Sequence, residues 1–421
     1  MAQSRHDMAV LAPGALALPN LRRFNAPDLL QRDGIDVPMA FANVRSQPGA
    51  VFIIPFLIMG GAEKYAADLV DVLRMKSVGP VLVIVTDQTE EEAFGWQKFE
   101  ILSPLQQSNI IFWRDICSSF KWQDPSALSR FINALQPRLV VIVNSHLGLE
   151  TVAKFGRGLS QFARLYCAFF SMGINGLGAP YGAYFPRRIM PFALALTDNQ
   201  PMEETLRRLH GEIPGPGIAT LPPRIRIISD ELSASRLSAR QERTLKGRER
   251  RWLWVSRIEP FKGTALLADL AKSRPADQFE VFGAVDGEQV PTELILKNIN
   301  VRPALQDVIM ADFTQFDGFI FTSLFEGMPN TVLEMSQHLI PMVLADVGGL
   351  RRTFDDDAAL FVPHGADTKE SAAAFSLALD RVIGMESVAI VRMVAAAQRQ
   401  MLAKHSSAAH ANTAATIFGI E

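Results

Sequence analysis

The sequence predicts a two-domain α/β protein in which each half folds around a parallel sheet. At 421 residues the chain is too long for one ordinary compact domain. Apolar runs alternate with helical stretches, which is typical of βαβ units. This alternation is interrupted by an arginine-rich stretch at residues 232–251 and then begins again. Two facing α/β halves would bind ligands in a cleft beyond the carboxyl ends of their strands.

In the first half, apolar runs predict strands, and periodic stretches predict helices at residues 62–73 and 125–135. Gly60 and Gly61 occupy the turn between the first strand and the first helix. Glycines there allow a ligand to approach the amides of the helix N-terminus. The expected strands are residues 50–56, 80–85, 109–113, 139–143, 166–170 and 192–197.

In the second half, helices are expected at residues 263–272 and 330–338, followed by alanine-rich helices from about residue 369. The expected strands are residues 252–256, 279–282, 318–322, 342–345 and 360–362. The domain bounds that we expect are a tail at 1–45, a first domain at 46–235, a linker at 236–250, a second domain at 251–403, and a C-terminal helix at 404–421 as a candidate to pack back on the first domain.

Composition excludes several classes of protein. The net charge of −2 gives no support for a nucleic-acid partner. Only two cysteines occur, Cys117 and Cys167, which excludes a disulfide scaffold and fits a reducing cytoplasm. No segment reaches ~18 uninterrupted apolar residues, so we expect no transmembrane helix. Residues 8–18 imitate a secretory signal, but Asp7 adjoins them and a Pro-Gly pair splits them, so a tail is expected.

The most informative segment is FTSLFEGMPNTVLE, residues 321–334, where a predicted strand ends and a helix begins. Pro329 suits the start of that helix, whose first amides, at Asn330, Thr331 and Val332, would form an anion site. Glu326 precedes the helix and Glu334 lies one turn inside it. A carboxylate beside an anion site suits a sugar phosphate, which has hydroxyls and phosphate oxygens. A helix start with glutamates placed for its dipole is the alternative.

A second loop of this kind, VSRIEPFKG, spans residues 255–263. Arg257 and Lys262 would lie at the mouth of the sheet, where two cations suit a diphosphate. An ordinary solvated loop is the alternative. The chain has neither a GxGxxG pattern nor a phosphate-binding P-loop.

The order GGAEK, SRIEPFKG, SLFEGMPNTVLE and VGGL resembles the retaining GT-B glycosyltransferases of family 4, also described as glycosyl transferases group 1. The resemblance covers residues 50 to the C-terminus and implies two Rossmann-like domains facing across a cleft. It implies that Arg257 and Lys262 hold the donor diphosphate, that Glu326 contacts the transferred sugar and that Glu334 contacts the ribose. Gly60 and Gly61 would approach the donor from the first domain. The remaining donor-binding residues that it implies are Gly327, Met328, Pro329, Asn330 and Thr331.

Several positions depart from the family pattern or match it loosely. Arg351 and Arg352 follow Gly348-Gly349 where the family usually has a glutamate. His146 lies where family members often carry a cleft histidine. It is therefore a catalytic candidate, and a structural histidine is the alternative. The DxD at residues 355–357 has the form of a metal-binding signature, but we expect a solvated surface turn. Residues 173–196, with Arg187 and Arg188, are an acceptor loop, a weak membrane-surface contact or a buried loop.

The predicted function is transfer of a sugar from a nucleotide diphosphate sugar to a glycan, lipid-linked or small-molecule acceptor. Two cations and a helix end can neutralise the leaving diphosphate, so we expect no metal and no cofactor. Retention and a role in glycan or polysaccharide biosynthesis are implied by the resemblance. We expect a cytoplasmic location, with peripheral contact at the inner face of the membrane left open. The alternatives are a GT-B nucleotide-sugar epimerase and a non-catalytic nucleotide-sugar-binding module of a polysaccharide assembly complex.

Overall fold

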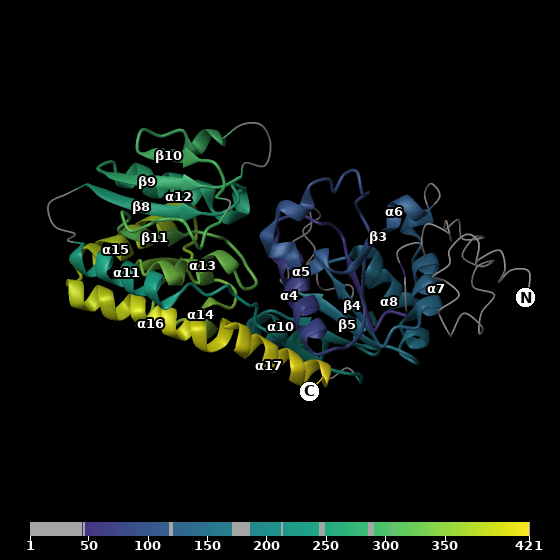
Figure 1. Cartoon of the computed structure of the whole chain (residues 1–421). Coiled ribbons are helices and arrows are strands. Elements are labelled where there is room, and N and C mark those ends of the chain that lie inside the picture. The colour runs from purple at the N-terminus through teal and green to yellow at the C-terminus, as the bar shows by residue number, and fades with distance from the viewer. Residues whose placement is uncertain are drawn as a thin grey trace, which may run out of the picture. The chain divides into compact units, whose positions relative to one another are not determined.

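A computed structural model of the chain describes residues 44, 47–117, 121–170, 186–211, 214–243, 249–284, 290–305 and 307–420. The chain divides into two compact domains, with boundaries after Leu221 and after His410. The residues between these boundaries form the second domain, and the segment from Ala411 onward belongs to the first. The ribbon in Figure 1 shows that each domain is a sheet flanked by helices. The expected tail at residues 1–45 lies outside the described residues, apart from Val44.

The first domain contains a seven-stranded parallel sheet in the order β3-β2-β1-β4-β5-β6-β7. The predicted strands of this half are confirmed, and β7 is one that the sequence did not predict. The strands are β1 (Ala50–Ile54), β2 (Val81–Val85), β3 (Asn109–Phe112), β4 (Leu139–Val143), β5 (Arg164–Phe169), β6 (Ala193–Thr197) and β7 (Ile218–Thr220). The helices are α4 (Gly61–Met75), α5 (Ser103–Gln106), α6 (Trp113–Ile116), α7 (Pro125–Leu135), α8 (His146–Leu159), α9 (Pro186–Ile189) and α10 (Gln200–His210).

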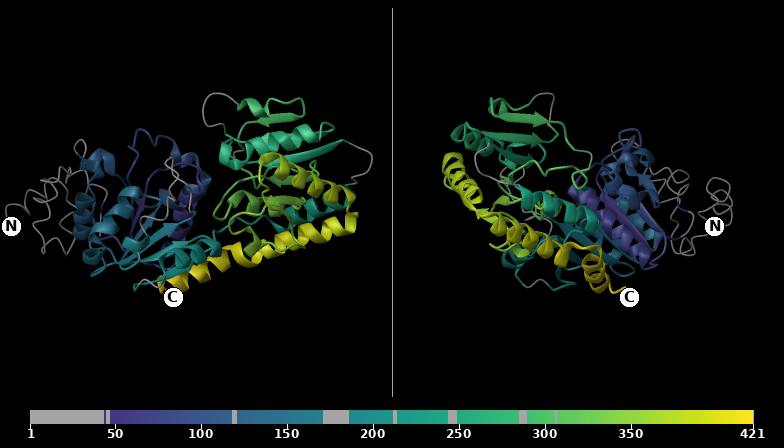
Figure 2. Two further views of the ribbon diagram at one scale, coloured as in Figure 1. Left: turned by 180° about the vertical axis from the view of Figure 1, so that it is seen from behind. Right: turned by 60° about the vertical axis from the view of Figure 1, so that its left-hand side comes forward.

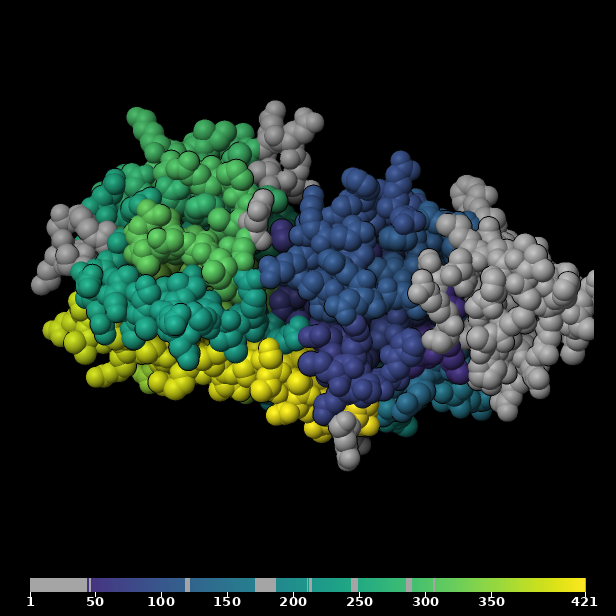
Figure 3. Space-filling view, viewed as in Figure 1, coloured from purple at the N-terminus to yellow at the C-terminus, as the bar shows by residue number. Residues whose placement is uncertain are grey.

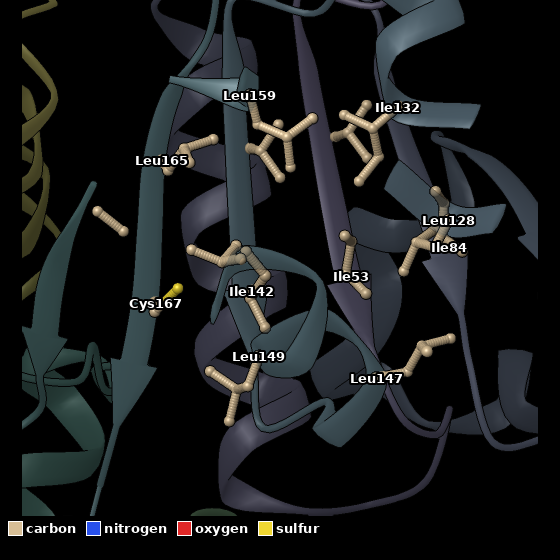
Figure 4. Close-up of a cluster of buried hydrophobic side chains, with 14 of the residues drawn as sticks. Ile53, Ile84, Leu128, Ile132, Ile142, Leu147, Leu149, Leu159, Leu165 and Cys167 are labelled. Carbon is tan, nitrogen blue, oxygen red and sulfur yellow. The ribbon is translucent and has the colours of Figure 1, made fainter. Parts of the chain in front are cut away.

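Both faces of this sheet are buried, because successive side chains of a strand point to opposite sides. In β1, Val51 and Ile53 belong to a cluster with α7 and α8, whereas Phe52 and Ile54 pack with α4. Figure 4 shows the first cluster, with side chains from neighbouring strands meeting those of the two helices: Ile53, Ile84, Ile142, Leu165, Leu128, Ile132, Leu147 and Leu149.

The second domain contains a six-stranded parallel sheet in the order β10-β9-β8-β11-β12-β13. Its strands are β8 (Arg250–Val255), β9 (Asp277–Phe282), β10 (Ile299–Arg302), β11 (Gly318–Phe321), β12 (Met342–Ala345) and β13 (Leu360–Val362). Its helices are α11 (Asp230–Glu242), α12 (Thr264–Ser273), α13 (Asn330–Met335), α14 (Leu350–Thr353), α15 (Thr368–Gly384) and α16 (Ser387–His405). The expected strands are confirmed, and β10 was not expected.

The two faces of the second sheet are covered by different helices. Trp252 and Trp254 of β8 pack with α12 and α15, while Leu253 and Val255 pack with α13 and α16. Figure 2 shows this domain from two further sides. The final helix, α17 (Ser407–Phe418), places Phe418 in the core of the first domain, where its ring lies 4.3 Å from that of Tyr166 between centroids.

The linker expected at residues 236–250 overlaps α11, which is an integral part of the second domain. Arg236 and Arg240 are buried and donate to backbone carbonyls of that domain, including those of Gln337 and Leu339, which follow α13. We expected this stretch to be a solvated linker or a linker helix. The described part is a helix, but it is not a solvated one, because its two buried arginines are bonded to backbone carbonyls of the second domain. Helices α11 and α16 lie side by side on the surface of this domain, as Figure 3 shows.

In both sheets the strand order reverses once at a corresponding place. The reversal lies between β1 and β4 in the first domain and between β8 and β11 in the second. Loops that leave neighbouring parallel strands on either side of such a reversal turn apart and create a crevice at the carboxyl edge, which is where ligands bind in doubly wound sheets. The loops singled out from the sequence are the ones at these two places.

Candidate functional site

The candidate site of the second domain is built from the loop after β8 and the loop after β11. The two strands are parallel neighbours, with Trp252 paired to Gly318 and Leu253 to Phe319. Because their carboxyl ends lie side by side, the loops at residues 256–263 and 322–329 meet at the sheet edge. The backbone amide of Leu324 donates to the carbonyl of Phe261 at 2.9 Å and so joins the two loops directly.

Lys262 and Glu326 form an ion pair across these loops. Lys262 Nζ lies 2.6 Å from Glu326 Oε1, and each side chain is 13% exposed. The hydroxyl of Thr322 donates to the carbonyl of Lys262 at 2.8 Å and accepts from the indole N–H of Trp254 at 2.9 Å. A buried tryptophan therefore fixes the backbone that carries the lysine.

Gly263 makes this approach possible. Its φ is +80°, and a Cβ atom there would lie 2.1 Å from the carbonyl oxygen of Thr322. Any other residue would push the two loops apart and separate the ion pair.

Arg257 lies in the same loop but outside this ion pair. Its guanidinium contacts Glu259 at 2.7 Å, and its side chain is 64% exposed while that of Glu259 is 9% exposed. The structure thus brings both expected cations to one loop, each beside a carboxylate. An exposed arginine can turn toward a ligand at little cost, since exposed ion pairs contribute only ~0–1 kcal/mol.

The segment from Gly327 to Thr331 forms the turn into α13. The carbonyl of Gly327 accepts from the amide of Gly349 at 2.8 Å, and Met328 is buried in the core. Pro329 precedes the helix, as expected. One expectation is wrong, because the amide of Val332 donates to the carbonyl of Pro329 at 3.1 Å and so is not available to an anion.

Two buried polar atoms of this loop have no partner among the described residues. They are the hydroxyl oxygen of Ser323 and the side-chain carbonyl oxygen of Asn330. Leaving a buried polar atom without a partner costs ~1–3 kcal/mol, so both atoms are candidates to bind a ligand or an ordered water. Ser323 was not among the predicted site residues, although its place directly after a predicted strand was the available signal. Glu334 is half-buried one turn into α13.

In the first domain, Gly60 precedes α4 and Gly61 is its first residue. A Cβ atom at Gly60 would lie 2.2 Å from a carboxylate oxygen of Glu63, which is itself buried. Packing of Glu63 is thus one reason for glycine at this position, beside the ligand approach that we expected.

His146 is the exposed first residue of α8 and follows β4, the neighbour of β1. Ser145 caps the helix by accepting from the amide of Gly148 at 3.1 Å, and its hydroxyl lies 2.9 Å from that of Thr86. The sheet therefore brings His146, Gly60 and Gly61 to one edge of the first domain.

The remaining candidates have local partners. Arg351 contacts Asp346 at 2.7 Å and Asp356 at 3.0 Å, and it lies over the ring of Phe361. Asp355 accepts from the amide of Asp357 at 3.0 Å, and all three aspartates are exposed in a turn. Across the described residues, no three His, Cys, Asp or Glu side chains are grouped to hold a metal ion. Most of the candidate acceptor loop at residues 173–196 lies outside the described residues, because residues 171–185 are not described. Arg187 and Arg188 of α9 are exposed.

Neither cysteine is a candidate nucleophile. Burial raises the pKa of the Cys117 thiol to about 12 and raises that of the Cys167 thiol further. Both remain protonated near neutrality, and a thiol is a far weaker nucleophile than a thiolate.

Comparison with known proteins assigns this fold. Residues 249–381 match the family model described as glycosyl transferases group 1. HepE of Anabaena, solved in complex with UDP, is similar over 88% of this chain and 99% of its own, with a TM-score of 0.63 at 15% identity. Sucrose-phosphate synthase of Thermosynechococcus elongatus is similar over 88% and 98%, with a TM-score of 0.64 at 14% identity. No curated protein matches the chain in sequence.

The chain has the GT-B fold. The resemblance stated from the motifs is confirmed for the fold over both domains and, at residues 249–381, for the family model. The galactosyltransferase WaaB, which acts on the lipopolysaccharide outer core, shares the fold with a TM-score of 0.62 at 13% identity. Among the described residues, no helix is long and apolar enough to cross a membrane.

Proposed function

We propose that this protein is a glycosyltransferase whose second domain binds a nucleotide diphosphate sugar between the β8 and β11 loops. The observation that carries the proposal is the Lys262–Glu326 ion pair, which lies where the strand order reverses. A cation and a carboxylate 2.6 Å apart offer a donor for phosphate oxygens and an acceptor for sugar hydroxyls. The similar HepE structures hold UDP and UDP-glucose.

The proposed roles follow from the place of each residue. Lys262 contacts the diphosphate, and Arg257 turns from Glu259 to reach it. The amides of Asn330 and Thr331 contact its oxygens at the turn into α13. Glu326 accepts from hydroxyls of the transferred sugar, and the half-buried Glu334 contacts the ribose.

The proposed reaction breaks the bond between the sugar's anomeric carbon and the diphosphate. Positive charge then develops on the sugar ring and negative charge on the departing diphosphate. Lys262 and Arg257 stabilise the diphosphate where its charge grows, which lowers the barrier rather than merely binding the donor. We propose transfer with retention, without a metal, to an acceptor hydroxyl in the assembly of a glycan or polysaccharide. The leaving diphosphate assists deprotonation of that hydroxyl.

We further propose that the first domain serves the acceptor at the edge that carries His146, and that Gly60 and Gly61 on the same edge contact the donor. An exposed imidazole can orient a sugar hydroxyl by hydrogen bonding. Its position at the start of a capped helix holds its backbone in place.

The test is a panel of nucleotide diphosphate sugars, first by thermal shift and then by release of nucleotide diphosphate with the full-length protein. We expect one donor to stabilise the protein and to be turned over. Arg257→Ala and Lys262→Met should each lower kcat/KM, and the decrease should correspond to a loss of ~2–4 kcal/mol of transition-state stabilisation. Donor binding without turnover under any acceptor would indicate a binding module, and conversion of the donor to an isomer would indicate an epimerase.

A further inference from the structure

Beside the ion pair, the same two loops hold a pair of aromatic rings. Phe261 directly precedes Lys262, and Phe325 directly precedes Glu326. The rings of Phe261 and Phe325 are stacked, with centroids 5.5 Å apart and planes inclined by 21°. Each loop therefore presents one ring and one charge, and the two rings meet just as the two charges do. We call Phe261 and Phe325 the aromatic platform.

The platform is held in place by its backbone. The amide of Leu324 donates to the carbonyl of Phe261, and the hydroxyl of Thr322 donates to the carbonyl of Lys262. These two bonds join the loops that carry the rings. The ammonium of Lys262 also lies 5.3 Å from the centre of the Phe261 ring. A ligand that stacks here would meet a surface that is already ordered, so little entropy is lost in forming it.

The platform remains open to solvent. Phe325 is 40% exposed, and Leu324 beside it is 47% exposed, while Phe261 is half-buried. Most large apolar side chains of this domain lie in its two cores. Exposed aromatic surface next to a polar site is typical of ligand-binding surfaces, because covering it gains ~25 cal/mol per Å².

The chemistry of the ligand follows from the combination of rings and charges. An acyl chain would cover the rings but has no hydroxyl groups for the ammonium of Lys262 and the carboxylate of Glu326, which would keep only each other as partners. A pyranose ring has an apolar face of C–H groups and a rim of hydroxyls. It can place the first on the rings and the second on the charges.

We propose that the aromatic platform stacks against the C–H face of a pyranose ring whose hydroxyls contact Glu326 and Lys262. This inference rests on the proposed function, and it assigns the platform to sugar recognition rather than to the nucleotide. The pyranose can belong to the donor, as the sugar to be transferred, or to the acceptor. Both sources present the same chemistry to the rings.

The test measures nucleotide and sugar separately. Binding of UDP and of UDP-glucose is titrated by calorimetry with the full-length protein. Saturation-transfer NMR then uses methyl β-galactoside, whose apolar face carries H3, H4 and H5, with UDP present. The variants are Phe325→Ala and Phe325→Leu, which remove the ring with and without loss of bulk, and Phe325→Trp, which keeps an aromatic ring. Phe94→Ala is the matched control, because Phe94 is 93% exposed in the first domain.

We expect Phe325→Ala and Phe325→Leu to leave the affinity for UDP unchanged. If the pyranose belongs to the donor, both variants should bind UDP-glucose about tenfold more weakly than the wild type, as a lost aromatic contact predicts. If it belongs to the acceptor, they should abolish saturation of H3, H4 and H5 of the galactoside. Phe325→Trp and Phe94→Ala should behave like the wild type.

The proposal is overturned if Phe325→Ala changes neither signal, or if the wild-type platform contacts neither sugar. It is also overturned if the Phe325 variants lose as much affinity for UDP as for UDP-glucose, since the ring would then contact the nucleotide. If the wild-type protein does not bind UDP at all, this result contradicts UDP as the nucleotide of the donor and therefore tests the proposed function, not the platform.

Discussion

Lys262 and Glu326 are 64 residues apart in the sequence, and their charged groups lie 2.6 Å apart in the structure. Each side chain is only 13% exposed, so removing either one leaves the other charge poorly hydrated and without its counter-ion. A bound diphosphate would compete with Glu326 for the ammonium of Lys262. In the free protein Glu326 neutralises the charge of Lys262, and donor binding is expected to replace Glu326 with the diphosphate as the partner of Lys262.

This competition predicts opposite effects of the two partners on nucleotide binding. Glu326→Gln removes the competing carboxylate, so free UDP should bind at least as tightly as to the wild type. The same change should lower kcat, because Glu326 is proposed to contact the sugar on which charge develops. Calorimetry and steady-state kinetics measure the two effects. A large loss of UDP affinity with normal kcat would reverse the proposed role of Glu326.

Glu334→Gln is expected to raise the KM for the donor and to leave kcat largely unchanged. Ribose contacts alter little during the reaction, so they contribute equally to the ground state and the transition state. Initial rates over a range of donor concentration separate the two parameters. A fall in kcat at unchanged KM would place Glu334 at the reacting sugar rather than at the ribose.

Activity is expected to persist in EDTA. The proposed cations, Arg257 and Lys262, neutralise the departing diphosphate, and the turn at Asp355 and Asp357 is satisfied locally by its own backbone amide. Transfer rates with and without chelator measure this. Loss of activity that Mg²⁺ or Mn²⁺ restores would contradict the metal-free mechanism.

His338 predicts a pH dependence of stability in the second domain. Burial, and then the positive charge of Arg236, lower the pKa of His338 to about 3. Its Nε2–H donates to the carbonyl of Val308 at 2.8 Å, so Nδ1 is the atom that would take a second proton, and Nδ1 has no hydrogen-bond partner among the described residues. Below the unfolded pKa of about 6.5, the unfolded state binds this proton more readily than the folded state.

The stability from this group is therefore present above about pH 6.5 and is lost as the pH falls toward 3. We expect a loss of ~2–3 kcal/mol by pH 4.5. Urea denaturation at pH 7.5 and pH 4.5 measures it in the wild type and in His338→Gln. The variant should lose less stability than the wild type, and an equal loss in both would show that His338 does not carry the effect.

The alternation of strands and helices was predictable because it follows from local apolar patterns, as in α7 and β4, whose bounds agree with the sequence prediction. Helix α8 was not predicted because it contains glycines that disfavour helix. Gly148 lies there because a Cβ atom would approach Ile142 to 2.8 Å, and Gly156 because one would approach Phe192 to 2.9 Å. Close packing against the sheet thus outweighs intrinsic helix propensity, which sequence alone does not reveal.

The site was predictable in its residues more than in its contacts. Arg257, Lys262 and Glu326 were identified by their places after strands. Their pairing depends on which strands are neighbours, and the adjacency of β8 and β11 is a property of the assembled sheet. The burial of the α11 arginines was not predicted for the same reason. Their carbonyl acceptors come from segments 70 or more residues away, such as Ile309 and Gln337.

The measurement that tests the central claim most directly is calorimetric titration of UDP, GDP, ADP and dTDP into the wild-type protein and two lysine variants. Lys262→Met removes the proposed diphosphate contact. Lys272→Met is the control, since Lys272 is 56% exposed in the same domain and pairs with Asp269. We expect one nucleotide to bind the wild type and the Lys272 variant alike, and to bind Lys262→Met at least tenfold more weakly, as loss of a charge-assisted contact predicts. Equal binding to all three proteins, or no binding of any nucleotide to the wild type, would contradict a donor site at the Lys262–Glu326 pair.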